Sequence, residues 1–186
     1  MNIFYLSADV TRCAQMHNDK HCVKMILEYS QLLSTAHRVL DGVQYVDDSS
    51  GRKIKRWRLP NVENDRILYT ATHINHPSAV WVRERYGNYI WLHSLLVRLC
   101  EEYTYRYGKM HKCASDGLVS KLTYVPRNIP MGVFAPPPPC MPEEYIVQGD
   151  CIGSYHNYYN GAKRHIASWK KRPVPYFIAT DEDSMI

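Results

Sequence analysis

The stretch HNDKHCVKMILE, residues 17 to 28, carries titratable side chains three and four residues apart. On a helix, four of them would share one sector of about 60°, namely His17, His21, Lys24 and Glu28. Two histidines at this spacing can bind zinc, and the glutamate could be a ligand or a base. Lys24 lies between them, however, and an ammonium close to a metal ion is electrostatically unfavourable. The pattern favours an anionic ligand and proton transfer, with a solvated face of satisfied histidines as the alternative.

A second cluster, THINHPSAVWVRER, surrounds a turn between two expected helices. His76 would stand at the start of a helix, where free amides and the helix dipole favour a phosphate, and Arg83 follows two turns later. The alternative is a capping histidine beside a structural proline, Pro77. Should the two clusters converge, their histidines with Lys24, Glu28 and Arg83 would form a basic, proton-transferring pocket.

The third signal is EEYTYRYGKMH, at the end of a long expected helix. Its cations would complement the helix dipole, or they would form a rim for phosphate and base stacking. The candidate catalytic residues of the chain are His17, His21, Glu28, His73 and His76. The candidate phosphate or nucleotide contacts are Lys20, Lys24, Trp81, Arg83, Arg106, Tyr107 and Lys109. No metal or other cofactor is expected, and the alternative is zinc or another divalent metal at His17, His21 and His76.

Composition limits these readings. At 186 residues and 45% apolar residues, the chain suits one domain with a real core, expected over residues 1–180 and followed by an acidic tail at 181–186. The net charge of +5 favours phosphate-bearing partners. Six cysteines form no C-x-x-C pair, and no leader or long apolar run is visible, so reduced thiols in a cytosol are expected rather than three disulfides.

The elements that must position these residues are mostly helices. Residues 2–6 suggest a short strand or extended opening, after which one helix is expected from an Asp9 cap to about Leu40, ended by Gly42. Further helices are expected at 62–75, from Pro77 to a break at Gly87, and from there to Gly108. The remaining expected helices cover 115–122 and 149–172. The fold class is therefore a compact, mainly α single domain with a short N-terminal strand.

Two loops complete this picture. The segment 41–60 mixes turn residues with cations and predicts a mobile basic loop, whose candidate nucleic-acid contacts are Arg52, Lys53, Lys55, Arg56 and Arg58. The segment 126–142 contains too many prolines for regular structure, and it predicts a bracing loop or a partner-binding strip.

The segments MNIFYL, AQMHNDKHCVKMILEYSQLLSTAHRVL, THINHPSAVWVRERYGNYIWL, EEYTYRYGK and WKKRPVPYF resemble an uncharacterised family of tailed-bacteriophage proteins. That resemblance covers nearly the whole chain and implies a protein acting in the cytoplasm of the host bacterium, but no particular activity. The chain is also distantly similar to the phage-type pyrimidine-dimer DNA glycosylases, through Ala14, Gln15 and His17 and through Arg106 and Gly108.

The chain departs from those glycosylases at the residues of their chemistry. They attack with the α-amine of a small second residue, whereas Asn2 is bulky enough that Met1 is expected to stay. Their catalytic glutamate would fall near Lys24, and Glu28 comes one turn later. The resemblance therefore implies DNA or nucleotide binding rather than base excision by that mechanism.

Four functions remain open from the sequence. The first is an enzyme acting on DNA or nucleotides, by base modification, glycosylase-like or phosphodiester chemistry. The second is a binding protein that sequesters a nucleotide of host defence. The others are a metal-dependent hydrolase and a purely structural or partner-binding phage protein. The expected partner is a nucleotide or DNA and not a membrane, and a homo-oligomer is left open.

Overall fold

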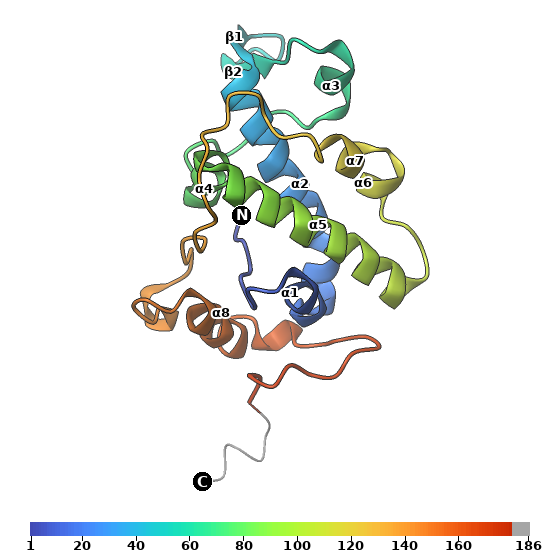
Figure 1. The fold of residues 1–186 in the computed structure, drawn as a ribbon, viewed down its shortest axis with the longest axis vertical. Coiled ribbons are helices and arrows are strands. Elements are labelled where there is room, and N and C mark those ends of the chain that lie inside the picture. Colours follow the sequence, from blue (N-terminus) through green and yellow to red (C-terminus); the bar gives the residue numbers. More distant parts are fainter. Residues whose placement is uncertain (180–186) are drawn as a thin grey trace.

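The computed structural model describes residues 1–179, so the expected acidic tail at 181–186 lies outside the described residues. The fold is mainly α-helical, as expected (Figure 1). Its elements are α1 (Val10–Met16), α2 (Asp19–Asp41), β1 (Val43–Asp47), β2 (Ile54–Arg58), α3 (Val62–Ile67), α4 (Pro77–Glu84), α5 (Tyr86–Tyr107), α6 (Lys112–Ser115), α7 (Leu118–Lys121) and α8 (Cys151–Asn160), with single 3-10 turns at Glu143–Tyr145 and Arg164–Ile166. None of the helices in this described part is both long and apolar enough to cross a membrane.

The long helices α2 and α5 cross at the centre of the molecule (Figure 1). Each buries one apolar stripe, because its leucines and aromatic residues recur three and four residues apart. The fully buried members of the stripes include Tyr29, Leu32 and Leu33 of α2 and Tyr89, Leu92, Leu95, Leu96 and Leu99 of α5. Helix α4 packs on α2 and α5, and α1 packs on α5. This crossing positions both histidine clusters.

The expected first helix is two helices, broken at His17 and Asn18. Asn18 begins α2 by accepting the amide of His21 on its side-chain oxygen, at 2.9 Å. Across the break, the Arg106 guanidinium donates to the carbonyl oxygens of Gln15 and His17, each at 2.9 Å. These tertiary hydrogen bonds satisfy carbonyls that a continuous helix would use itself. The caps predicted at Asp9, Gly42 and Gly108 are confirmed.

Residues 2–6 do not form a strand, which corrects the expected N-terminal strand. They run extended and buried against α2, where the Phe4 amide donates to the Tyr29 hydroxyl at 3.1 Å. The only strands in residues 1–179 pair with each other in the hairpin, so this segment has no strand partner there. Its run of four apolar residues, Ile3 to Leu6, therefore reflects burial between helices.

The segment expected as a mobile loop instead contains an antiparallel hairpin of β1 and β2, in a register that pairs Val43 with Arg58 and Asp47 with Ile54. Gly51 supplies the left-handed conformation of its turn, at φ +77°. The guanidinium of Arg38 also donates to the carbonyl of Trp57 at 2.8 Å and so ties the hairpin to α2. The sequence shows the turn residues of the hairpin, but it does not show the hydrogen bond from buried Arg38 that holds the hairpin to α2.

Three further boundaries differ from the expectation. The helix expected over 62–75 stops at Ile67, and Arg38 binds the carbonyl of Leu68 just beyond it. The helix expected over 149–172 stops at Asn160, followed by a 3-10 turn. Gly87 does not break the helix: the break is at Arg85, and Gly87 lies in the first turn of α5.

The Pro-rich loop, residues 126–142, has no helix or strand, as expected. It crosses the start of α5, where the Gly87 amide donates to the carbonyl of Gly132 at 2.9 Å. A Cβ on Gly87 would lie 2.3 Å from the amide nitrogen of Phe134, so the glycine is needed for this close approach. The loop therefore braces α5. All six cysteines of the chain are free thiols, as expected.

Candidate functional site

One small cavity lies where the chain begins, and we call it the N-terminal cavity. It has a volume of about 140 Å³, and its walls are formed by Met1, Asn2, Phe4, His21, Lys24, Met25, Glu28 and Lys163. Cavities that hold whole small-molecule ligands usually measure about 300–1,000 Å³. The N-terminal cavity therefore suits a phosphate-sized group and not an entire nucleotide.

The charges around this cavity are mainly positive. Lys24 reaches it from α2 and forms an ion pair with Glu28, its Nζ 3.3 Å from Oε1. Lys163 approaches from the segment after α8, with its ammonium 5.0 Å above the ring centroid of Tyr158. The α-amine of Met1 belongs to a third lining residue. Three cationic groups against one carboxylate leave a net positive charge, which favours an anion.

His21 faces this cavity as a neutral imidazole. Its ring stacks on Phe4 with centroids 4.0 Å apart, and its Nδ1 lies 2.7 Å from the hydroxyl of Tyr159. Burial, with the positive charges of Lys163 and Lys24 nearby, lowers the pKa of His21 to about 2. The side-chain amide of Asn18 lies 3.4 Å from Nδ1 and can only donate, which favours Nδ1 of His21 as the acceptor and Nε2 as the donor. His21 is therefore suited to hydrogen bonding instead of the proton transfer expected from the sequence.

His17 lies inside the protein and does not line the cavity. Its Nδ1 donates to the carbonyl of Cys13 at 2.7 Å, and its Nε2 accepts from the hydroxyl of Tyr29 at 2.8 Å. Burial lowers its pKa to about 4. Because both ring nitrogens are engaged, His17 holds the break between α1 and α2, and the expected catalytic role is not supported.

His76 brings the second cluster close to the first. It caps α4 by accepting the amide of Ser78 on Nδ1, at 3.1 Å. Burial lowers the pKa of His76, the charges of the Met1 amine and His73 lower it further, and the charge of Glu28 raises it. These groups are thus within electrostatic reach of one another. The two clusters are therefore near each other, although neither His73 nor His76 lines the N-terminal cavity.

His73 is exposed in a left-handed backbone conformation, at φ 48°. Such a conformation costs a non-glycine residue about 1–3 kcal/mol. Its Nδ1 lies 2.8 Å from the hydroxyl of Thr72, and the Thr72 amide in turn donates to Thr35 of α2. The strained turn therefore places the His73 ring in solvent near His76.

Two residues of the second cluster have structural roles. The indole nitrogen of Trp81 donates to the carbonyl of Ala135 at 2.9 Å, so this buried ring anchors the Pro-rich loop. Arg83 donates to the carbonyl of Ala79 in its own helix, at 3.0 Å, and burial lowers its pKa. Neither residue lines the N-terminal cavity, which corrects their assignment as nucleotide contacts.

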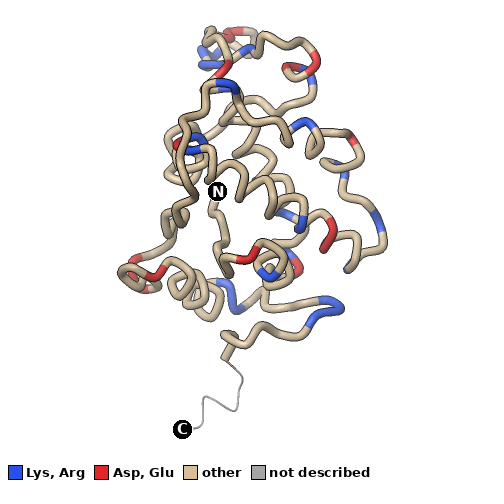
Figure 2. The backbone as a smooth tube through the Cα atoms, in the orientation of Figure 1, with Lys and Arg blue, Asp and Glu red and all other residues tan. Residues whose placement is uncertain are grey.

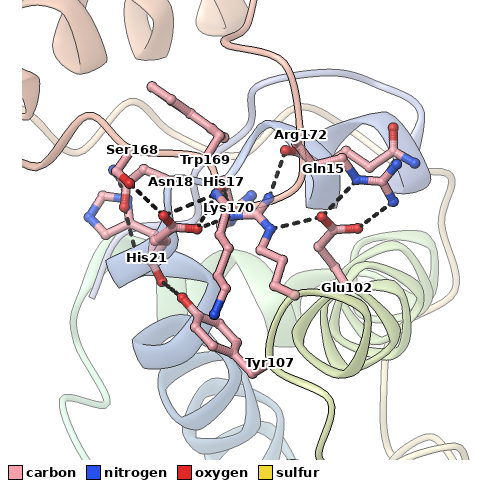
Figure 3. Close-up of polar contacts among 12 residues, drawn as sticks. Gln15, His17, Asn18, His21, Glu102, Tyr107, Ser168, Trp169, Lys170 and Arg172 are labelled. Atoms are coloured by element: carbon pink, nitrogen blue, oxygen red, sulfur yellow. Dashed lines mark hydrogen bonds and ion pairs between the residues drawn. The ribbon is translucent and has the colours of Figure 1, made fainter.

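Arg106, expected to bind phosphate, is instead buried in a polar network that joins three parts of the chain. Its guanidinium donates to Glu102 at 2.8 Å, to Asp19 at 3.0 Å and to the two carbonyls at the helix break. Figure 3 shows Glu102 also bound by Arg172, at 2.9 and 3.0 Å. With its donors engaged and no exposed surface, Arg106 is unavailable to a ligand.

Tyr107 and Lys109 of the third cluster, and the other phosphate candidate Lys20, lie at or near the surface. Lys170 places its ammonium 5.2 Å above the ring centroid of Tyr107, whose hydroxyl contacts the carbonyl of Asp19 at 3.5 Å. Lys109 and Lys20 are exposed, and neither lines the N-terminal cavity. None of these four side chains lines the N-terminal cavity.

The basic residues of segment 41–60, which was predicted to be a loop, lie on the β1–β2 hairpin. The hairpin is at the C-terminal end of α2, away from the N-terminal cavity (Figures 1 and 2). Arg56 pairs with Asp47 at 3.5 Å, and Arg58 stacks over the Tyr45 ring at 4.9 Å. Arg52, Lys53 and Lys55 are exposed. The hairpin cations thus form a surface separate from the N-terminal cavity.

The alternative metal site is not assembled. Among residues 1–179, no group of three or more histidine, cysteine, aspartate or glutamate side chains is placed to hold a metal ion. His17, His21 and His76 fail as a set because both ring nitrogens of His17 are bonded internally.

Sequence reasoning missed Met1, Asn2 and Lys163 as cavity residues. Lys163 follows α8 without any spacing that relates it to α2, so no local signal could have identified it. The extended, strongly apolar opening was a weak signal that the N-terminus is buried near a helix.

No protein-family model, no curated protein and no solved structure matches this chain. Its function must therefore be inferred from the chemistry of its own residues.

Proposed function

We propose that the protein is an enzyme that binds a phosphate group of DNA or of a nucleotide in the N-terminal cavity, with Glu28 as the proton acceptor. One observation carries the proposal: Lys24, Lys163 and Met1 line a phosphate-sized space together with a single carboxylate residue, Glu28. The proposed setting, suggested only by the sequence resemblance, is a bacteriophage protein in the host cytoplasm.

Each lining group has a distinct role in this proposal. The ammonium groups of Lys24 and Lys163 would hold the phosphate oxygens, and Nε2 of His21 would donate a further hydrogen bond. Because His21 stays neutral, it adds this bond without changing charge over the physiological pH range. Glu28, whose side chain is 17% exposed, keeps a partly solvated carboxylate that could take a proton.

The size of the cavity places the rest of the ligand outside it. A sugar and base would extend over the surface, toward the rim where His73 and His76 lie near Met1 and Glu28. An imidazole that is unprotonated at neutral pH, as the lowered pKa of His76 implies, could accept or donate a hydrogen bond there. Ligand specificity would then depend on this rim.

Replacing Lys163 with alanine is expected to weaken phosphate-dependent binding roughly 10- to 150-fold, because a charge-assisted hydrogen bond contributes about 1.5–3 kcal/mol. Binding is measured by calorimetric titration with inorganic phosphate, nucleoside phosphates and short DNAs. Lys112→Ala, which removes an exposed lysine of α6, is the matched control. Equal affinities of wild type and Lys163→Ala for every ligand would overturn the proposed site.

The same titration separates catalysis from sequestration. An enzyme converts the bound ligand, whereas a sequestering protein returns it unchanged after prolonged incubation. Chromatography of the recovered ligand detects the difference. Tight binding with intact ligand throughout would replace the proposed enzyme with a nucleotide-sequestering protein.

A second candidate function follows from the position of the α-amine. Met1 shares the cavity with Glu28, although the sequence placed this glutamate one turn away from its counterpart in the pyrimidine-dimer glycosylases. In amine catalysis of that class, the nitrogen bonds to the sugar C1′ while the bond from C1′ to the base breaks. The base leaves with that electron pair and takes up a proton, which a carboxyl group can supply.

Borohydride reduction tests this candidate. If the Met1 amine forms an imine with the aldehyde of an abasic site in DNA, reduction is expected to give a covalent protein–DNA adduct. Acetylation of the α-amine should abolish the adduct, and peptide mapping should locate it at Met1. No adduct with the unblocked protein, or an adduct that survives acetylation, would exclude amine catalysis at the N-terminus.

A further inference from the structure

A larger cavity lies at the other end of α2, and we call it the hairpin cavity. Its volume is about 340 Å³, which falls within the usual range for ligand pockets. It opens between the C-terminal part of α2, the segment that leaves β2 and the residues before the Pro-rich loop. His21 and His37 are separated by roughly 24 Å along α2, at 1.5 Å per residue, so the two cavities are distinct.

The charged groups in the hairpin cavity are already satisfied or neutral. The carboxylate of Asp41 accepts the amides of Arg127 at 2.7 Å and Asn128 at 2.9 Å. Burial lowers the pKa of His37 to about 4, against the opposing charge of Asp41, so its ring is neutral at physiological pH. A ligand of this cavity therefore meets no free carboxylate and no buried cation.

Several neutral groups in the cavity are free to bind a ligand. The carboxamide of Asn64 makes no hydrogen bond with any residue in 1–179, and the amide nitrogen of the Asn61 side chain likewise has no partner there. The Tyr124 ring is 76% exposed at the mouth. Leu59 and Val125 form an apolar part of the cavity wall, and Arg127, which is exposed, lies at its rim.

This combination matches the chemistry of a nucleobase. Asparagine carboxamides pair with the donor and acceptor edges of bases, because both present a donor beside an acceptor. A tyrosine ring offers a face for stacking, and a guanidinium at the rim suits the attached phosphate. A base must leave its stack to enter such a cavity, which is easiest in a single strand.

The hairpin extends this site with positive charge. Leu59, in the cavity wall, directly follows β2, and the hairpin turn carries Arg52 and Lys53 with Lys55 just beyond. None of these three cations forms an ion pair or stacks on a ring within residues 1–179. Five residues of strand span roughly 17 Å, so a strand of a few nucleotides could reach from the cavity to the turn.

We infer that this end of the molecule binds single-stranded nucleic acid, with one unstacked base in the hairpin cavity and neighbouring phosphates on Arg52, Lys53 and Lys55. The site adds a second, spatially separate contact to the phosphate site of the N-terminal cavity. The two sites can be tested independently, because no residue lines both cavities.

Fluorescence anisotropy with a labelled single strand of about 12 nucleotides tests the inference. Tyr124→Leu is expected to weaken binding roughly 5- to 150-fold, as loss of base stacking does. Asn64→Leu should weaken it in the same direction. Tyr176→Leu removes a tyrosine of equal exposure, 78%, far along the chain and should leave the affinity unchanged.

The hairpin cations are tested through salt dependence. In the Lys53→Ala, Lys55→Ala double variant, the slope of log affinity against log salt should fall by about 1.4, the value for two phosphate contacts on a single strand. Lys112→Ala should retain the wild-type slope. The Tyr124→Leu effect should also persist in a Lys163→Ala background, which separates this site from the N-terminal cavity.

Two outcomes would overturn the inference. One is an unchanged affinity of Tyr124→Leu and Asn64→Leu for the single strand. The other is a preference for duplex over single-stranded DNA, which would mean that the hairpin contacts a groove and that the cavity takes no base.

Discussion

Glu102→Gln is expected to lower the free energy of unfolding by about 3–5 kcal/mol, the usual cost of breaking a buried ion pair from one side. Glu102 is 4% exposed and is bound by Arg106, which has no exposed surface, and by Arg172. Glutamine keeps the shape but removes the charge, so the buried guanidinium of Arg106 would lose one of its two carboxylate partners and keep only Asp19. Urea denaturation followed by circular dichroism measures the change.

Glu101→Gln is the matched control, because the neighbouring glutamate pairs with Arg98 at the surface, with both side chains about half exposed. Surface pairs contribute at most about 1 kcal/mol, so this variant should remain close to wild type. Equal losses in the two variants would contradict the structural role assigned to the Arg106 network.

The same network predicts how stability depends on pH. Burial by itself would raise the pKa of Glu102, but hydrogen bonds from Arg172 and Arg106 outweigh it and hold the pKa below its ordinary value. A carboxyl with a lower pKa in the folded state stabilises the protein above its unfolded pKa of about 4.3 and loses this contribution as the pH falls. Wild type should therefore lose more stability than Glu102→Gln below about pH 5. Parallel stability curves for the two proteins would contradict this assignment.

Glu28→Gln is expected to lower turnover about 10²- to 10⁴-fold, the usual contribution of a general base, while ligand binding stays within a few-fold of wild type. The reason is that glutamine occupies the same space beside Lys24 but cannot take a proton. Turnover is measured with the ligand identified by titration, and the dissociation constant is measured on the same protein.

The split between turnover and binding identifies the role of Glu28. Removing a carboxylate from a cavity that holds an anion should not weaken binding, because it reduces repulsion. A variant that binds normally and turns over at the wild-type rate would show that Glu28 is not the proton acceptor. Equal losses of binding and turnover would also contradict that role, since the residue would then serve to position the ligand. Glu101→Gln serves again as the control.

Several features followed from the sequence because they depend on neighbours in the chain. The apolar stripes of α2 and α5 have the helical period, and Asp9, Gly42, Pro77 and Gly108 act within one turn of a helix end. The mainly α fold class and the irregular Pro-rich loop were predicted on the same local grounds.

The histidines illustrate where this reasoning stopped. His17 and His21 were predicted to share one polar helix edge, but the helix breaks at His17. His17 is buried and bonded to Cys13 and Tyr29, whereas His21 faces the N-terminal cavity. The spacing of residues along a helix predicts the direction of each side chain but not its contacts. The groups that contact the two imidazole rings belong to residues 4, 29 and 159, far along the chain. Such partners have no sequence signature.

Arg106 shows the same limit for charge. A cation at a helix end suggested a surface rim, but the residue is buried because Glu102, Asp19 and two free carbonyls surround it. A buried ion requires partners on every side, and these come from α1, the break after it, α2 and α5.

The sequence by itself determined the helical class of the protein, the helix ends at Asp9, Gly42, Pro77 and Gly108, and the excess of positive charge, since these depend on composition and on residues within a few positions of each other. Only the tertiary structure decided which charged side chains are internal supports and which line a cavity. That distinction depends on long-range packing, which brought the first residues of the chain, α2 and Lys163 together around one small space.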